Sequence, residues 1–151
     1  MRKLTEHIIQ LNFTDEKGFD APMASPRPRF RNAGKFVQTY MPTNYTKHKE
    51  YLRSQMTALG IEGPIKVSIE FYFPMLKSWS KKKQAASVLT YKVTKPDIDN
   101  LLKTVMDAAN NHVWKDDNQI VEVHSFKKYA ETSRIIMKIT EVEEWLSESQ
   151  S

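Results

Sequence analysis

The 151-residue sequence contains no cysteine, which excludes disulfides, thiolate zinc sites and thiol nucleophiles. No apolar run approaches the roughly 18–20 residues that a membrane helix requires, and the first 12 residues are charged throughout. The sequence also lacks a glycine-rich phosphate loop and a serine-hydrolase motif, and its 4 histidines do not have the spacing of metal ligands. We therefore expect one soluble, cytoplasmic domain spanning residues 1–151, with no membrane partner.

Basic residues are in excess and are clustered. Lys and Arg number 23 against 18 Asp and Glu, which gives a net charge of +5. Acidic residues gather instead at 97–117 and in the tail at 141–151. A basic surface around a small acidic site suits a protein that holds a phosphodiester backbone beside a divalent cation. We assign phosphate contacts to two basic clusters: Arg27, Arg29 and Arg31, and Lys81, Lys82 and Lys83.

The hydrophobic pattern predicts an α/β (α+β) domain in which two helices pack on one mixed β-sheet, in the order β-α-β-α-β-β. The expected helices run from Thr43 to Leu59, closed by Gly60, and from 98 to 109, where the apolar residues form one stripe. The expected strands cover 8–12, 65–73, 119–127 and 134–140, and the last two are predicted to form a hairpin. A possible hairpin edge is expected at 34–37, and a flexible basic loop at 75–94.

The stretch KPDIDNLLK at 95–103 places two carboxylates at the start of the second helix. In a continuous helix Asp97 and Asp99 would point about 200° apart and could not share a ligand. Pro96 favours extended backbone before it, so we expect Asp97 at the N-cap and Asp99 in the first turn. A cap side chain that folds back would bring both carboxylates to one cation. The alternative is that both acids serve only to cap the helix and to offset its dipole.

A second acidic cluster, Asp116-Asp117, lies just before a strand. Together the two clusters offer oxygen ligands of the kind that Mg²⁺ or Mn²⁺ prefers. A calcium-binding EF-hand loop is excluded because leucines stand where it needs an oxygen ligand and a glycine. Lys103 either belongs to an exposed charge ladder with Asp99 and Asp107, or stabilises charge on a scissile phosphate.

KPDIDNLLKTVMDAAN followed by VWKDDNQIVEV resembles the RusA family of Holliday junction resolvases, whose pattern is DxDN-x-x-K and then DD-x-Q. The resemblance extends to Pro-Arg-Pro-Arg-Phe at 26–30 and to Lys127-Lys128. It implies an endodeoxyribonuclease of phage or prophage origin that acts in the bacterial cytoplasm as a homodimer on four-way junction DNA, with Mg²⁺ or its substitute Mn²⁺. It also implies roles for particular residues: the metal ligands Asp97, Asp99 and Asp117, with Asp116 as a further candidate, and the catalytic lysine Lys103.

Two other kinds of function are compatible with the residues alone. A non-catalytic nucleic-acid-binding module would explain the basic clusters, with the acids as helix caps. A partner-binding protein would use the acidic tail. Substitution of Asp97, Asp99 and Asp117 by asparagine distinguishes them, because purely capping acids chiefly change stability, by roughly a kcal/mol.

Overall fold

The computed structural model describes residues 5–27, 29–34 and 36–143. Its centre is a four-stranded mixed sheet with the strand order β1-β6-β4-β5. These strands are β1 (Glu6–Asn12), β4 (Ile65–Pro74), β5 (Ile120–Ala130) and β6 (Arg134–Glu141). A separate hairpin pairs β2 (Arg29–Ala33) with β3 (Phe36–Tyr40). The helices are α1 (Thr43–Ser54), α2 (Lys81–Ser87) and α3 (Ile98–Ala109). The predicted fold class is confirmed.

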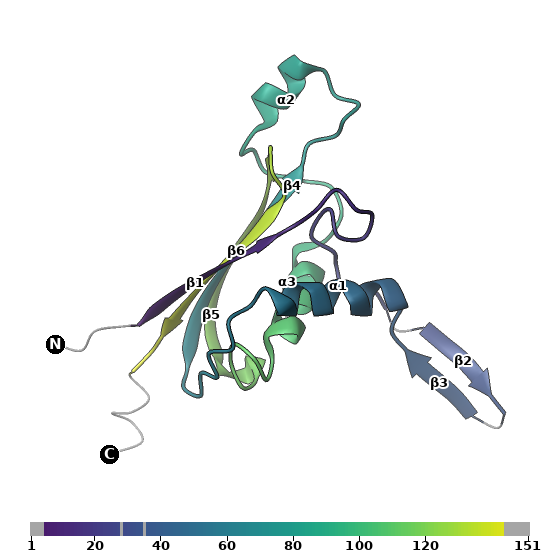
Figure 1. The fold of residues 1–151 in the computed structure, drawn as a ribbon, viewed down its shortest axis with the longest axis vertical. Helices are drawn as coiled ribbons and strands as arrows, with labels where there is room; N and C mark the ends of the chain where they lie inside the picture. The colour runs from purple at the N-terminus through teal and green to yellow at the C-terminus, as the bar shows by residue number, and fades with distance from the viewer. Residues whose placement is uncertain (1–4, 28, 35, 144–151) are drawn as a thin grey trace.

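The helices α1 and α3 lie on one face of the sheet, α2 lies beyond one of its ends, and the β2–β3 hairpin projects away from it (Figure 1). Alternate side chains of β4, from Ile65 to Phe73, are buried against α1 and α3. The apolar stripe of α3 supplies Leu101, Val105 and Ala108 to the same core. Burial of a regular apolar stripe fixes how α3 is rotated, so its charged residues face outwards. No helix in the described residues is long and apolar enough to cross a membrane.

The predicted hairpin between the last two strands is wrong. β4 lies between β5 and β6, parallel to β5 and antiparallel to β6. The crossover through α3 returns the chain to the starting end of β4, and a strand that follows such a crossover runs parallel. The turn after β5 then crosses the end of β4, where the Ser133 hydroxyl donates to the Tyr72 carbonyl at 3.1 Å.

The end of α1 and the connection at 75–94 also differ from expectation. α1 ends at Ser54 rather than Leu59, and Gln55, not Gly60, is its C-cap. The Gln55 amide is held by Asn12, accepting from its N–H at 2.8 Å and donating to its carbonyl at 3.1 Å, and this turns the chain out of the helix. The connection at 75–94 was expected as a loop but contains α2, whose N-cap Ser80 accepts from the Lys83 N–H at 3.1 Å. The possible hairpin edge at 34–37 corresponds to the β2–β3 hairpin.

Candidate active site

The first acidic pair lies at the start of α3. Asp97 is the N-cap residue and has extended backbone, as predicted, and Asp99 lies in the first turn. The Asp97 side chain makes no capping hydrogen bond, so the expectation that it folds back over the turn is wrong. Asp99 accepts from the neighbouring N–H of Asn100 at 2.9 Å. Both carboxylates are exposed to solvent. Capping therefore does not account for the acid at position 97.

The chain in front of Asp97 is fixed by Lys127, a residue of the family pattern to which the sequence analysis gave no role. The Lys127 ammonium, from β5, donates to the carbonyls of Thr94 and Pro96, both at 2.8 Å. Lys92 adds a hydrogen bond to the Thr94 hydroxyl at 2.8 Å. These contacts join the segment 94–96 to the sheet, and they set the position from which α3 begins. Only the family pattern, which includes Lys127, could have pointed to it.

The basic N-terminal segment meets α3 at the same turn. The Ser25 N–H donates to the Asn100 carbonyl at 2.9 Å. Arg27 follows two residues later and is exposed. Arg29 and Arg31 fall on β2, and their side chains lie outside what the structure describes. Arg27 therefore lies two residues from the hydrogen bond that joins this segment to the first turn of α3, where the first acidic pair is. Arg29 and Arg31 lie further along the chain, on the projecting hairpin.

The second acidic pair lies at the start of β5. Asp116 caps the short 3₁₀ helix η1 (Asp117–Gln119), accepting from the Asn118 N–H at 3.1 Å. Gln119 completes a capping box because its side chain accepts from the Asp116 N–H at 2.7 Å. The Gln119 amide also donates to the carbonyls of Ile61 and Gly63, at 2.8 and 2.9 Å. Asp116 thus has a structural role that leaves Asp117 as the better candidate ligand.

The Asp117 carboxyl lies among groups from the far end of α3. Loss of solvent around it raises its pKa above the ordinary value, and a hydrogen bond with Asp116 and the charges of Asp116 and Asp107 raise it further. A hydrogen bond from Asn110 has the opposite effect. These neighbours show that Asp117 sits beside the last turns of α3, whereas Asp97 and Asp99 occupy its start.

Lys103 lies between the two acidic ends. Asp99, Lys103 and Asp107 follow one another at four-residue spacing on the outward face of α3, which separates the two acids by about 12 Å along the axis. Among the described residues Lys103 forms no ion pair with either acid, so the charge ladder, one of the two interpretations of this lysine, is not supported by an ion pair. In the same part of the chain no three His, Asp or Glu side chains lie close enough together to hold one metal ion. One chain therefore does not gather Asp97, Asp99 and Asp117.

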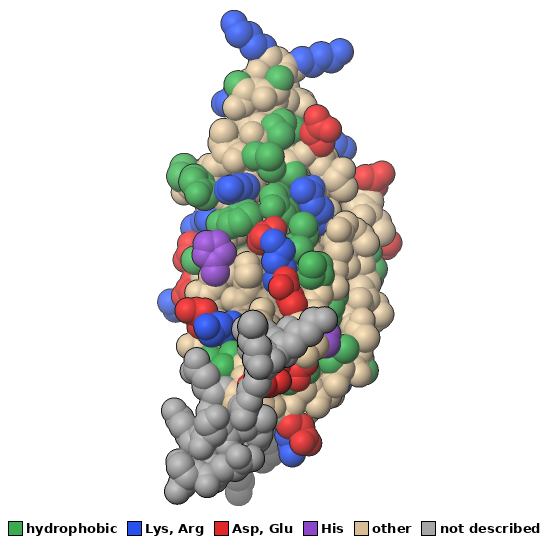
Figure 2. All heavy atoms as spheres, turned by 90° about the vertical axis from the view of Figure 1, so that its left-hand side faces the viewer, with side chains coloured by type: hydrophobic (Ala, Val, Ile, Leu, Met, Phe, Trp, Pro, Cys, Tyr) green, Lys and Arg blue, Asp and Glu red, His purple; other side chains and the backbone are tan. Residues whose placement is uncertain are grey.

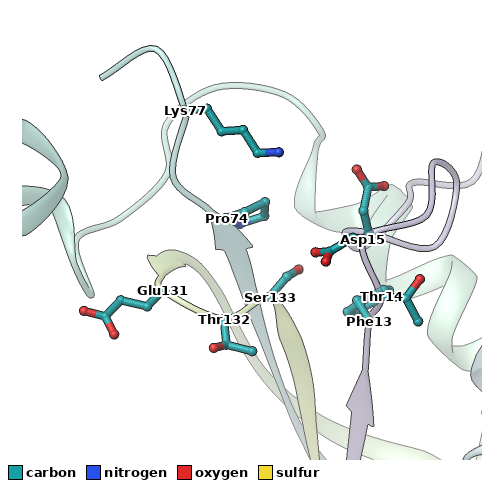
Figure 3. A pocket seen from close by; sticks show the side chains of 9 residues that line it. Phe13, Thr14, Asp15, Pro74, Lys77, Glu131, Thr132 and Ser133 are labelled. Carbon is teal, nitrogen blue, oxygen red and sulfur yellow. The ribbon is translucent and has the colours of Figure 1, made fainter. Parts of the chain in front are cut away.

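Surface hollows lie at both ends of α3. One of about 600 Å³ is lined by residues including Asp20, Asn44 and Pro96, next to the first acidic pair. Another of about 460 Å³ is lined by residues including Asn110 and Asp116, at the second. A third, of about 300 Å³, lies at the end of the sheet. Figure 3 shows the Lys77 side chain extending over this third hollow towards Asp15.

The remaining predicted DNA-binding residues are the three lysines at the start of α2. Lys81, Lys82 and Lys83 are exposed, and the Lys83 ammonium stands 4.5 Å from the centre of the Trp79 ring. His112, which follows the end of α3, shares a 2.8 Å hydrogen bond with the Met56 carbonyl, so its ring acts as a structural donor. The lysine cluster is thus well placed for contacts with a polyanion at one end of the sheet.

Comparison with known proteins shows similarity to RusA endodeoxyribonucleases. A family model described as endodeoxyribonuclease RusA matches residues 21–140. The chain is 34% identical over 132 residues to the protein named "Uncharacterized protein YqaN" from Bacillus subtilis strain 168, covering 82% of this chain and 93% of that protein. It is also 34% identical over 80 residues to the crossover junction endodeoxyribonuclease rusA of Lactococcus phage r1t, covering 52% of this chain and 56% of the phage protein. The range matched by the family model contains both acidic pairs and Lys103.

Proposed function

Since the chain belongs to the RusA family of endodeoxyribonucleases, we propose that it is a Mg²⁺-dependent, structure-selective endonuclease that resolves Holliday junctions in DNA recombination and repair. The observation that carries this proposal is the exposed acidic pair at the start of α3, in which the N-cap residue Asp97 makes no capping hydrogen bond. The exposed basic residues Arg27 and Lys81, Lys82 and Lys83 of α2 suit the phosphates of a branched DNA substrate.

The chemistry of the donor set fits Mg²⁺, with Mn²⁺ as a substitute, because all of the candidate ligands are carboxylates. The ligands would be Asp97, Asp99 and Asp117, with Asp116 as a further candidate. Bound Mg²⁺ would supply Lewis-acid chemistry at the scissile phosphate. In the described residues of one chain these carboxylates do not come close enough together to hold one metal ion, which does not fit a site built by a single chain.

We therefore assign the missing ligand to a second copy of the chain. β5 is an edge strand, and between residues 120 and 126 no strand of the described ranges pairs with its outer edge. Val121 and Val123 are 61% and 44% exposed there. If two such edges pair antiparallel, the Asp117 end of one copy approaches the Lys127 and Asp97 end of the other. The pair would then hold two equivalent sites, as paired cuts across a symmetric junction require.

Within each site the protein residues have separate tasks. Lys127 holds the segment before Asp97, so that the acidic pair meets the substrate in a fixed position. Lys103, exposed on the same outward face, would stabilise negative charge that develops on the phosphate in the transition state. The α2 lysines and Arg27 would hold the duplex arms through their phosphates.

The test of activity uses a labelled four-way junction and a linear duplex of the same sequence, each with and without Mg²⁺. We expect symmetric, Mg²⁺-dependent cuts in the junction and none in the duplex. Asp97→Asn, Asp99→Asn and Asp117→Asn should each abolish cleavage and retain junction binding. An inert wild-type protein would refute the proposal.

The test of the second copy mixes inactive variants. One chain carries Asp97→Asn and Asp99→Asn, and the other carries Asp117→Asn. If the ligands come from two copies, a mixed pair contains one intact site, and nicking of the junction returns on mixing. If each chain supplied its own three ligands, no intact site could form and the mixture would stay inactive. Asp97→Asn mixed with Asp99→Asn is the matched control, because neither arrangement can restore a site from these two.

A further inference from the structure

The face of the sheet opposite α1 and α3 has no helix over it (Figure 1). Its side chains are the outward-facing residues of the strands, and the cross-strand register sets them in rows. One row consists of Lys128, Tyr72 and Arg134, and the next begins with Phe126. Figure 2 looks onto this side of the molecule and shows basic and hydrophobic side chains mixed over its upper half.

Aromatic rings and cations are in contact at the α2 end of this face. The Lys128 ammonium lies 4.3 Å from the centre of the Phe126 ring and 5.0 Å from that of Tyr91. The Arg134 guanidinium lies 4.1 Å from the centre of the Tyr72 ring. Tyr72 and Phe126 meet edge to face at 5.6 Å. We call these residues the aromatic–cation face: Tyr72, Tyr91, Phe126, Lys128 and Arg134.

The two cations of this face lack acidic partners. Neither Lys128 nor Arg134 has a carboxylate within ion-pair distance in the described ranges. The nearby Glu70 carboxylate is already paired with Lys138 at 3.2 Å, and it accepts from the Tyr72 hydroxyl at 3.0 Å. Tyr91 is 67% exposed, although it is a large aromatic residue. The face therefore offers uncompensated positive charge next to an accessible ring.

We infer that the aromatic–cation face binds an unpaired stretch of DNA, with bases stacked on Tyr91 and Phe126 and phosphates on Lys128 and Arg134. Bases stack on aromatic side chains only where their faces are free, and in a duplex the neighbouring base pairs cover those faces. Contacts with duplex phosphates need cations but no rings. The combination of rings and unpaired cations thus favours a single strand, such as the opened bases near a branch point. This inference rests on the proposed action on DNA.

A second copy of the chain is a poorer occupant. In a two-fold contact the same surface patch of each copy faces that of the other. The unpaired cations of one copy would therefore approach those of the second copy. Like charges brought together without a counterion oppose association. The phosphate groups of a DNA strand supply that counterion.

The experiment measures binding of a fluorescein-labelled oligothymidine of about 15 nucleotides, and of a duplex of equal length, by anisotropy in the presence of a chelator. We expect Tyr91→Ala to weaken oligothymidine binding by about tenfold and to leave duplex binding within about twofold of wild type. Phe126→Leu should act in the same way. Ile8→Thr is the matched control, because Ile8 is an exposed, non-aromatic residue of the same face and should change neither affinity.

Photo-crosslinking with 5-iododeoxyuridine in the oligonucleotide gives a readout that does not depend on variants. Crosslinks to Tyr91 or Phe126 support the inference, and crosslinks only to other surfaces overturn it. Equal loss of oligothymidine and duplex binding would also overturn it, as would dissociation of a dimer by Tyr91→Ala. Cleavage is not needed here, so a protein that binds the oligonucleotide at Tyr91 but cuts no junction refutes the nuclease proposal alone.

Discussion

Lys127 links the sheet to the acidic pair through its two hydrogen bonds to the carbonyls of Thr94 and Pro96. Lys127→Met removes both bonds while keeping the length of the side chain. We expect the cleavage rate constant at saturating protein to fall by at least about tenfold, because displaced reacting groups slow the reaction strongly. Junction affinity should change by less than about threefold, since at most one phosphate contact is lost. Single-turnover cleavage and gel-shift titration measure the two quantities.

Two variants make this test specific. Lys127→Arg keeps a donor that can reach both carbonyls, so it should recover part of the rate. Lys66→Met removes a cation from the same sheet that forms only an exposed ion pair with Glu122, at 3.7 Å, and it should leave the rate unchanged. A loss of affinity with no loss of rate would show that Lys127 binds DNA instead of positioning Asp97.

His48 makes the stability of the fold depend on pH. Its ring is buried, Nδ1 is 2.8 Å from the Gly18 carbonyl, and Nε2 has no partner in the described structure. Burial lowers the pKa of His48 below its ordinary 6.5, against the smaller opposing effects of Gly18 and Asp20. Below pH 6.5 the unfolded chain therefore takes up a proton more readily than the folded one, and the folded state loses stability.

We expect the free energy of unfolding to fall below pH 6.5 by up to about 1.4 kcal/mol per pH unit from this residue. Urea unfolding of wild type and His48→Gln at pH 7.5, 6 and 5 measures it. The difference between the two proteins isolates His48 from the other histidines. A difference that stays constant over this range would contradict the assignment.

At the level of elements, regular patterns were predictable and pairings were not. The apolar stripe of α3 and the alternation of β4 fixed both elements to within a residue or two, including Asp97 as N-cap. Alternation does not report the exposure of each outward residue: Tyr72 points away from the helices but is only 8% exposed, because Arg134 and Phe126 cover its ring. The predicted hairpin between the last two strands was wrong because strand order depends on the crossover through α3. The spacing of hydrophobic residues within each strand gives no information about that crossover.

The free edge of β5 should carry the contact between two copies. Val121→Lys with Val123→Lys puts charge on this edge and removes exposed apolar surface. We expect sedimentation equilibrium to shift from dimer towards monomer, and Mg²⁺-dependent cleavage to be lost with it. Ile8→Lys on β1, the other edge strand of the sheet, is the control and should stay dimeric. A dimer that survives the valine substitutions would place the contact elsewhere.

Across the whole molecule, the candidate site was predictable as a list of residues but not as an arrangement. The motifs DxDN and DD-x-Q identify acidic residues by their order in the chain. In the structure the first pair lies at the start of α3 and the second pair lies beside its last turns. No local pattern reports that separation, because it follows from the length of a buried helix and from where β5 begins. The same is true of Lys127, whose role depends on contact with a segment more than 30 residues earlier.

The overall charge of +5 has a consequence that depends on where the lysines lie. Each phosphate contact releases counterions, so the logarithm of the binding constant falls by about 0.9 per contact for each unit of log salt concentration. Replacing Lys81, Lys82 and Lys83 with glutamine should make this slope shallower by up to about 2.7, with little dependence on DNA sequence. The control variant replaces Lys47, Lys49 and Lys66 together, which removes the same charge from surfaces without an assigned DNA contact.

Fluorescence titrations of a junction over a range of salt concentrations compare the two triple variants. Equal slopes would mean that net charge alone governs binding, whereas a shallower slope confined to the α2 variant would locate the duplex arms at that end of the sheet.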